Sequence, residues 1–551
     1  MRKLLLLSFL AFAFFQLPAQ DTLSKSDIPV AAKLLDLHFT QSEIDSMYDG
    51  VKSNLSGYQL MHKQTLSNGV PMTLWQSPVL PGMHFSEKQE KIKWNIPANV
   101  EVPANKNELS FYSILQLASL LKNKKISSVE LTKFFIERLE KYGDSLQCVI
   151  SITEEIAMQQ AQEADAEIAK GKYRGLLHGI PYGLKDLFSV KGTKTTWGAA
   201  PYKNQVIDED AFVYSQLKEA GGVLIAKFTL GALAMGDYWY GGRTRNPWNI
   251  KTGSSGSSAG STSATVAGLV PFAIGTETWG SIVSPSSTCG ATGLRPTFGS
   301  ISRSGAMTLS WSLDKVGPIS RSASDAAIVF NYIHGTDGLD MSAVNKPFNY
   351  KPQADITKLK VAYAKNYFDK ITDTSRNEWK VLEAYRKMGV ELIPVNFPDS
   401  GVYNFNIMNV VISAEGAAAF DEFTRNNIDD EMTRQGKFDW PNTFRTSRLM
   451  SAVEYINANR HRFLLMQKVN ELMNTVDVLI CPTRNSGNQS AITNLTGHPV
   501  VCMPTGFDKR FNLPTSITLI GKLYDEATIL SVAKAYQDVT PWEDMHPAMF
   551  K

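Results

Sequence analysis

The stretch at residues 252–285 reads TGSSGSSAGSTSATVAGLVPFAIGTETWGSIVSP, in which two turns of glycine and serine enclose a short apolar segment. Glycine lets the backbone approach a ligand closely, and a serine hydroxyl can donate a hydrogen bond, accept one or act as a nucleophile. The enclosed residues 264–270 are small and apolar enough to form a buried helix between packed layers. We therefore expect rigid structure to hold the two serine turns together, so that they converge on one site.

The composition is that of an ordinary globular protein. Of the 551 residues, 43% are hydrophobic and 20% are charged, which is typical of soluble domains. The net charge of +3 is too small to indicate a polyanionic partner, so we expect no nucleic acid. The length exceeds that of most single domains but suits a large single-sheet enzyme, which predicts one large catalytic unit with additions.

The first residues have the pattern of a secretory signal peptide. Arg2 and Lys3 precede an apolar run at residues 4–15, and Ala19 offers a small residue for cleavage. The run is shorter than the roughly 20 apolar residues that span a bilayer, and no later run reaches that length. We therefore predict a signal peptide at residues 1–19, a mature chain that is periplasmic or secreted, and no stable membrane insertion. A buried N-terminal helix is the alternative.

Cysteine and histidine give no sign of a metal or cofactor site. The four cysteines are too scattered to define a disulfide framework, and the eight histidines are equally dispersed. The sequence contains neither H-E-x-x-H nor C-x-x-C, so we expect no metal and no cofactor. The cysteines beside apolar or turn residues are expected to be small buried thiols: Cys289, Cys481 and Cys502.

Two regions with different patterns precede the glycine and serine turns. Residues 20–106 combine helical periodicity with a proline-rich stretch, and we predict that they form a helical extension. Residues 109–142 show apolar positions at helical spacing on both sides of a lysine-rich break at residues 122–125, which predicts two helices. A further amphipathic helix is expected at residues 154–170. The main catalytic domain is expected at residues 107–551.

A single lysine lies inside an apolar segment. Residues 177–188 read LHGIPYGLKDLF and are predicted to form a short strand that contains Lys185. Because burying an ammonium group without a partner is costly, this lysine must either reach water or lose its charge. The first alternative is an ordinary lysine whose amine reaches the surface, whereas a neutral buried lysine is a competent general base.

Several ordered motifs resemble those of the amidase signature family. GIPYGLKDLF is followed by RTRNPWN at residues 243–249, SGSSAGS at 255–261, AIGTETWGSI at 273–282 and CGATGLRPTFG at 289–299. Downstream, SLDKVGPISRSASDAA, DVLICPT and NLTGHPVVCMPTGF continue the match, which covers roughly residues 107–540. The resemblance implies an α/β fold, a single large domain whose central mixed β-sheet is covered by helices on both faces.

The resemblance also implies a Ser-cisSer-Lys triad. Ser281 matches the nucleophile, Ser257 precedes it at the family's interval after a cis peptide bond from Gly256, and Lys185 matches the family's lysine. A neutral Lys185 would take a proton from Ser257, which in turn takes one from Ser281 as it attacks the amide carbonyl. Expulsion of ammonia or an amine leaves an acyl-enzyme that water hydrolyses. The expected activity is that of an amidohydrolase.

An oxyanion hole is expected directly before the nucleophile. The backbone N–H groups of Thr278, Trp279, Gly280 and Ser281 match the family's oxyanion loop, and such donors stabilise the tetrahedral intermediate. The sequence departs from the family at Trp279, where glycine is common. A tryptophan would be strained there if that glycine needs a positive φ angle. Alternatively, the indole forms a pocket wall.

A second departure from the family concerns the substrate. Many members carry an arginine two or three residues after the nucleophile, whereas Val283 and Ser284 stand there in this chain. Without that cation, and with several aromatic residues near the motifs, the expected substrate is a neutral, partly apolar small-molecule or peptide amide. In style this is closest to exported peptide amidases. The side chains expected to contact the substrate are Ser258, Tyr238, Trp239 and Val283.

The same residues allow other interpretations. Residues 256–260 also fit G-x-S-x-G, a nucleophile elbow with Ser258 as nucleophile, but that motif requires a preceding strand and residues 246–253 are typical of a turn. A flexible linker is the simplest alternative, and a phosphate loop would need G-K-[ST]. For function, the alternatives are a catalytically degenerate binding protein and a transamidosome-type glutaminase subunit. The sequence is also compatible with a homodimer.

Overall fold

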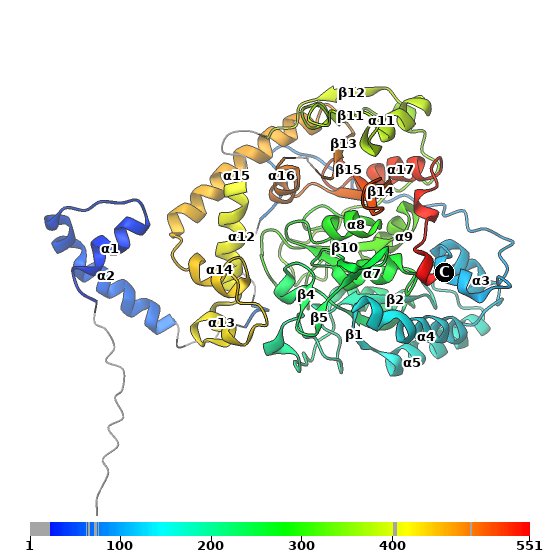
Figure 1. Ribbon diagram of the computed structural model, residues 1–551, viewed down its shortest axis with the longest axis horizontal. Helices are drawn as coiled ribbons and strands as arrows, with labels where there is room; N and C mark the ends of the chain where they lie inside the picture. Colours follow the sequence, from blue (N-terminus) through cyan, green and yellow to red (C-terminus); the bar gives the residue numbers. More distant parts are fainter. Residues whose placement is uncertain are drawn as a thin grey trace, which may run out of the picture. The chain divides into compact units, whose positions relative to one another are not determined.

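The computed structural model describes residues 23–61, 63, 67–70, 74, 76–399, 405–484 and 487–551. The chain divides into two compact units, Met1–Leu66 and Ser67–Lys551. The first contains helices α1 (Asp27–Leu34) and α2 (Gln41–Met61), drawn in blue in Figure 1. The expected signal peptide at residues 1–19 lies outside the described residues.

The extension predicted at residues 20–106 is helical only in its first part. Residues 67–106 belong to the second unit, and the described residues among 67–105 form neither helix nor strand. Prolines at positions 81, 97 and 103 explain this, because a proline removes a backbone donor and its ring clashes with the preceding helical turn. Half-buried apolar side chains of this segment, such as Trp94, pack against the main core.

The second unit is built around one mixed sheet of 11 strands. β2 pairs in parallel with β3 and β8, β11 pairs in parallel with β12 and β13, and the other pairs are antiparallel. This architecture confirms the predicted α/β fold class. In spatial order the strands are β1 (Val149–Ile152), β3 (Val223–Phe228), β2 (Pro181–Lys185), β8 (Ala273–Glu277), β10 (Lys315–Ser320), β9 (Thr292–Arg295), β14 (Val500–Phe507), β15 (Pro514–Gly521), β13 (Val478–Pro482), β11 (Val361–Ala364) and β12 (Leu392–Val395).

Helices cover both faces of this sheet. Side chains alternate between the faces of a strand, and along β10 Ile319 packs with residues of α7 and α8, whereas Val316 lies in the large core shared with α9 and α17. Figure 1 shows α4 and α5 near β1, at one end of the sheet. The α-helices of this unit are α3 (Ile114–Lys122), α4 (Ser128–Leu146), α5 (Glu154–Ala169), α6 (Phe212–Glu219), α7 (Ala259–Val266), α8 (Val283–Cys289), α9 (Ala323–Ile333), α10 (Lys365–Phe368), α11 (Asn377–Lys387), α12 (Phe405–Ala419), α13 (Asp421–Arg425), α14 (Trp440–Ser447), α15 (Ala452–Met473), α16 (Gln489–Thr496) and α17 (Glu526–Gln537).

The two helices predicted within residues 109–142 are α3 and α4. Each begins with a capping box, in which the first serine and a Glu or Gln three residues later satisfy each other's backbone N–H groups. The pairs are Ser113 with Gln116 and Ser127 with Glu130. The lysine-rich break falls between the helices, and α5 coincides with the third predicted helix. These local predictions are confirmed.

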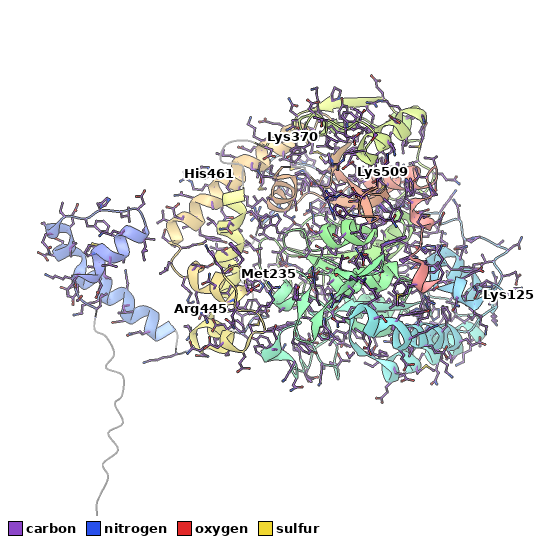
Figure 2. The ribbon with its side chains drawn as sticks, in the orientation of Figure 1. Lys125, Met235, Lys370, Arg445, His461 and Lys509 are labelled. Atoms are coloured by element: carbon purple, nitrogen blue, oxygen red, sulfur yellow. The ribbon has the colours of Figure 1, made fainter. Side chains whose placement is uncertain are left out.

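The three cysteines expected to be buried thiols, Cys289, Cys481 and Cys502, are buried. All four cysteines are buried free thiols, and charged side chains such as Lys125 and Lys509 project outward (Figure 2). Within the described part of the chain, no helix is both long and apolar enough to cross a membrane. In the same part, no group of three or more His, Cys, Asp or Glu side chains is arranged to hold a metal ion.

Candidate active site

Lys185 is the last residue of β2 and is fully buried. Its Nζ lies 2.7 Å from Ser257 Oγ and 2.8 Å from Thr276 Oγ1. Burial lowers the pKa of Lys185 to about 7, even though the carboxylates of Asp314 and Glu277 favour the charged form. The alternative of a lysine whose amine reaches the surface is therefore wrong. A substantial fraction of this amine is neutral near pH 7.

Ser257 lies in the loop that leads into α7 and is fully buried. The peptide bond from Gly256 to Ser257 is cis, as the family resemblance implies. Gly256 lets the loop pack against a neighbouring turn, because a Cβ at this position would lie 1.9 Å from the carbonyl oxygen of Gly236. Asp237 holds the loop from the same side, since its carboxylate accepts the Ser255 N–H at 3.1 Å.

The two serine turns converge, as the sequence predicts. The N–H of Ser258 donates to the carbonyl oxygen of Ser281 at 3.0 Å, so the two loops run side by side. The small apolar helix between them, α7, is buried along its whole length. Ser281 keeps 7% of its surface exposed, whereas Ser257 and Lys185 keep none. Of these three residues, the expected nucleophile is the one that solvent reaches.

Glu277 closes the loop that carries Ser281. Its carboxylate accepts the N–H groups of Ile282 and Val283, both at 2.9 Å, and Arg295 donates to it at 2.8 Å. Burial acts to raise the pKa of Glu277, but the guanidinium and the hydrogen bonds outweigh it and lower the pKa to about 2. An ionised carboxylate thus anchors the chain directly after Ser281.

Trp279 adopts an unstrained backbone conformation. The positive φ angle in this loop falls at Gly280, at +87°, and Trp279 is not among the residues with positive φ. Its half-buried side chain packs against the core cluster that contains Val283 and Leu313. The strain that a tryptophan would suffer in a left-handed position therefore does not arise.

Thr278 is tied to a second loop across the end of the sheet. Its hydroxyl donates to Asp314 Oδ1 at 2.6 Å, while Asp314 Oδ2 accepts the N–H groups of Leu309 at 2.8 Å and Ser310 at 3.0 Å. Burial raises the pKa of Asp314, and these hydrogen bonds act in the opposite direction. The expected oxyanion loop is therefore fixed at both ends. Glu277 binds the backbone directly after Ser281, and Asp314 binds the hydroxyl of Thr278, the first residue of the loop.

Two helices hold the loop at residues 309–314 in turn. Glu415 of α12 accepts the hydroxyl of Ser310 at 2.6 Å and the N–H and hydroxyl of Ser312 at 2.9 and 2.7 Å. Arg462 of α15 donates to the carbonyl and hydroxyl oxygens of Ser312, both at 2.9 Å. A continuous series of hydrogen bonds thus runs from α12 and α15 to Thr278.

Comparison with known proteins places this site in a family. The family model described as Amidase matches residues 130–489. One glutamyl-tRNA(Gln) amidotransferase subunit, from Coxiella burnetii (strain RSA 493 / Nine Mile phase I), is 32% identical over 481 residues, which cover 79% of this chain and 99% of the relative. The chain belongs to the amidase family. This amidase is therefore an enzyme that acts on amide carbon–nitrogen bonds.

Solved structures agree with the assignment. The native peptide amidase from Stenotrophomonas maltophilia is 25% identical to this amidase, with a TM-score of 0.69 over 77% of this chain and 96% of that chain. An amidase family protein from Bacillus anthracis str. Ames is 23% identical, and its TM-score of 0.71 over 80% of this chain and 93% of that chain shows a shared fold.

Two of the side chains expected to contact the substrate occupy structural positions in this amidase. The Ser258 hydroxyl donates to the Thr276 carbonyl at 3.0 Å and accepts the Thr276 N–H at 3.1 Å, and the residue is fully buried. Val283 begins α8 and packs in the core. Both residues position the loops that carry the expected triad.

The expected aromatic residues do not form a single wall. Tyr238 is 40% exposed, and its ring lies between the guanidinium groups of Arg243 at 4.9 Å and Arg434 at 4.5 Å. Half-buried Trp239 meets the ring of Tyr240 edge to face at 5.0 Å. Trp248 and Trp279 pack against two other clusters. Met235, labelled in Figure 2, lies three residues before Tyr238 and is half-buried.

The residues before Ser257 are not a simple turn. β7 (Asn249–Gly253) pairs with β6 (Arg245–Asn246) as a short antiparallel hairpin, because the turn occupies only the two residues between these strands. The prediction of a turn throughout residues 246–253 is wrong. A strand does precede the serine loop. The structure nevertheless argues against Ser258 as the nucleophile of an elbow motif, because Ser258 is buried and its hydroxyl is hydrogen-bonded to the backbone of β8.

Three residues that support the candidate site were not predicted from the sequence. Thr276 and Glu277 belong to the GTET motif, and Asp314 belongs to the SLDKVGP motif. The motifs were a signal that these positions matter. The roles depend on contacts with Lys185, Arg295 and Thr278, which only the folded chain provides.

Proposed function

We propose that this amidase hydrolyses a carboxamide C–N bond through a serine acyl-enzyme. Ser281 is the nucleophile, Ser257 relays protons and Lys185 is the general base. The observation that carries the proposal is the 2.7 Å separation of Lys185 Nζ and Ser257 Oγ in a fully buried site. The buried lysine has a pKa of about 7, which suits a base that must give up and regain a proton near neutral pH.

The proton path accounts for both half-reactions. Neutral Lys185 accepts the Ser257 hydroxyl proton while Ser257 accepts that of Ser281, and the Ser281 oxygen bonds to the amide carbon. Collapse of the tetrahedral intermediate breaks the C–N bond, and the proton returns along the same path to the leaving ammonia or amine. Water then attacks the acyl-enzyme and gives its proton to the same relay. As the bond between the acyl carbon and the Ser281 oxygen breaks, the relay returns that proton to Ser281 and the carboxylic acid leaves.

The backbone N–H groups of Thr278, Trp279, Gly280 and Ser281 are the donors for the oxyanion in this proposal. Glu277 and Asp314 support it, because they anchor this loop before the substrate arrives. Preorganised donors of this kind contribute about 2.7–4 kcal/mol each to transition-state stabilisation.

A serine-directed fluorophosphonate tests the nucleophile. We expect a covalent adduct on Ser281 in the purified protein, located by peptide mass spectrometry, and no adduct in Ser281→Ala. Ser258→Ala serves as a control, because the Ser258 hydroxyl is buried and hydrogen-bonded to the backbone of Thr276. This variant should still be labelled on Ser281, provided that circular dichroism shows it to be folded. Labelling of Ser281→Ala at full stoichiometry would refute the assignment.

An amidotransferase subunit is the second candidate, because the Coxiella burnetii relative carries that name. Such a protein would supply ammonia to a partner rather than act alone. The activity of the isolated chain therefore distinguishes an independent hydrolase from an amidotransferase subunit. Steady release of ammonia from acetylated dipeptide amides, fatty amides or aryl acylamides supports the independent hydrolase. Release from the acetylated dipeptide amides alone would select a peptide-amidase activity.

We also propose that the enzyme is exported. The basic residues and apolar run at residues 2–15 support this proposal. Expression of the full chain in a bacterial host should yield a periplasmic or secreted protein whose amino terminus, by Edman sequencing, lies close to residue 20. A cytoplasmic product that retains Met1 would contradict the proposal.

A further inference from the structure

A cavity of about 350 Å³ borders two neighbours of the proposed catalytic residues, Thr276 and Thr278. It touches Thr276, whose hydroxyl contacts the Lys185 amine, and Thr278, the first residue of the proposed oxyanion loop. Its volume is at the lower end of the range of about 300–1,000 Å³ that ligand pockets show. The residues that line it therefore decide which chemical group can stand beside the scissile amide.

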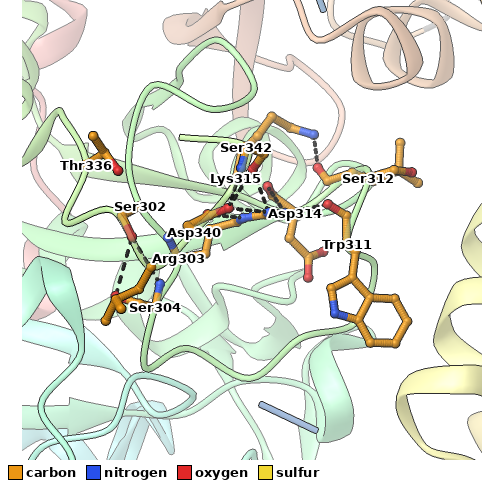
Figure 3. Close-up of polar contacts among 12 residues, drawn as sticks. Ser302, Arg303, Ser304, Trp311, Ser312, Asp314, Lys315, Thr336, Asp340 and Ser342 are labelled. Atoms are coloured by element: carbon orange, nitrogen blue, oxygen red, sulfur yellow. Dashed lines mark hydrogen bonds and ion pairs between the residues drawn. The ribbon is translucent and has the colours of Figure 1, made fainter. Parts of the chain in front are cut away.

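The single guanidinium in the lining has no donor left for a ligand. Arg303 Nε and one terminal nitrogen donate to the two carboxylate oxygens of Asp340 at 2.7 and 2.9 Å. The same terminal nitrogen reaches Ser342 Oγ at 2.7 Å, and the other reaches the carbonyl oxygens of Trp311 at 2.7 Å and Asp314 at 3.4 Å. All five N–H groups of the side chain are thus engaged (Figure 3).

The two buried carboxylates of the lining, Asp340 and Asp314, are equally occupied, whereas the third, Glu209, lies at the exposed rim. Besides the guanidinium, Asp340 accepts the backbone N–H of Arg303 at 3.0 Å and both the N–H and the hydroxyl of Ser342, at 3.0 and 2.7 Å. Asp314 accepts the Thr278 hydroxyl and two backbone N–H groups. Neither carboxylate has the open geometry that would pair with a cationic ligand.

The amine of Lys315 is directed away from the cavity. Lys315 is the β10 neighbour of Glu277, and paired residues on adjacent strands point to the same face. Its Nζ therefore lies on the α8 side of the sheet, opposite to Thr276, and donates to the Leu313 carbonyl. In Figure 3 this amine points away from the Arg303 side chain.

Apolar side chains supply most of the remaining surface. Met341 and Leu339 stand at the open edge, 40% and 71% exposed, and Glu209 is an exposed carboxylate at the rim. The Trp311 indole projects away from the Arg303–Asp340 pair in Figure 3. The buried apolar side chains of the lining are Leu187, Ala234, Met307, Leu309 and Val316.

We propose that this cavity binds an uncharged, apolar substituent of the amide substrate and discriminates against charged ones. This inference rests on the proposed function. A charge placed in the buried part of the cavity would lose water and find no free counter-charge there, since Glu209 lies at the exposed rim, and this is costly. An apolar group has no hydrogen bonds to water to lose in the cavity, and it gains contacts with the buried side chains. The enzyme should therefore favour neutral amides over amides that carry a carboxylate or an ammonium group.

Three amides of equal chain length test the preference: hexanamide, adipic acid monoamide and 6-aminohexanamide. We expect kcat/KM for hexanamide to exceed that for either charged amide at least about tenfold, because each charge would enter the cavity unpaired. Equal values, or a preference for a charged amide, would overturn the inference. Fluorophosphonate labelling of Ser281 in the same preparation separates the two questions. Labelling with the wrong preference refutes the inference alone, and absence of labelling refutes the proposed function.

A substitution at the open edge adds a charge without disturbing the core. Met341→Lys places an unpaired amine at the cavity, so we expect hexanamide turnover to fall and adipic acid monoamide turnover to rise, each at least about threefold. Val344→Lys is the matched control, because Val344 is 37% exposed against 40% for Met341 and does not line the cavity. It should leave both rates unchanged. Identical substrate profiles for the two variants, at equal melting temperatures, would count against the cavity as the binding site.

Discussion

At the scale of single residues, burial sets the chemistry of Lys185. A lysine in water is protonated up to about pH 10.4 and cannot accept a proton at neutral pH. Here burial lowers the pKa to about 7, and the two hydroxyls at the amine offer hydrogen bonds rather than a negative charge. The neutral form is the one that acts as base in the proposed mechanism.

The pH dependence of hydrolysis follows from that lowered pKa. The protonated lysine cannot accept a proton, so kcat/KM should rise with pH through about 7 and level off above it. Lys185→Arg carries a guanidinium that stays protonated, so we expect turnover to fall by about 10²–10⁴-fold. Initial rates between about pH 5 and pH 9 measure both effects. A wild-type profile without a rise below about pH 8 would show that this amine is not the titrating base.

At the scale of elements, hydrogen bonds between loops hold the site together. The Thr278 hydroxyl joins the loop after β8 to the loop before β10 through Asp314, and α12 and α15 hold that second loop through Glu415 and Arg462. The loop proposed to supply the oxyanion donors is therefore connected to helices more than 100 residues later in the chain.

Removal of that hydroxyl tests whether the connection matters for catalysis. In Thr278→Val, Asp314 loses a donor while the side-chain shape is kept, and we expect kcat to fall about tenfold with little change in KM, since a lost hydrogen bond of this kind costs about 1–3 kcal/mol. Thr278→Ser retains the hydroxyl and should restore most of kcat. Steady-state kinetics with equal melting temperatures measure the difference. Equal kcat values for the two variants would show that Asp314 has only a structural role.

At the scale of the whole molecule, the proposed catalytic residues all belong to the unit Ser67–Lys551. This unit contains the complete 11-stranded sheet and its own hydrophobic core. Because a domain with its own core is able to fold alone, deletion of residues 1–66 should leave the melting temperature of the main transition within about 3 °C and Ser281 labelling intact. Calorimetry and fluorophosphonate labelling of the truncated chain measure this. Loss of cooperative melting would show that the first 66 residues are needed for folding.

Local patterns were sufficient for some parts of this architecture. The capping boxes at Ser113 and Ser127 and the apolar spacing after them depend on residues three or four positions apart, so α3 and α4 were predictable. The same holds for the small helix α7 between the serine turns. The described residues among 67–105 differ from the predicted helical extension because their backbone is set by spaced prolines, such as those at positions 81, 97 and 103, rather than by helical periodicity.

The sequence by itself determined the family, the α/β fold class and the convergence of the two serine turns, because ordered motifs and residue spacing are properties of the chain. Only the tertiary structure decided that Lys185 is buried against Ser257 and Thr276, that Ser258 and Val283 are held in the interior, and that Arg303 and Asp340 neutralise each other beside the site. The physical reason is that burial and hydrogen-bond saturation depend on partners far away in the chain. Such partners become neighbours only when the strands of the sheet are assembled.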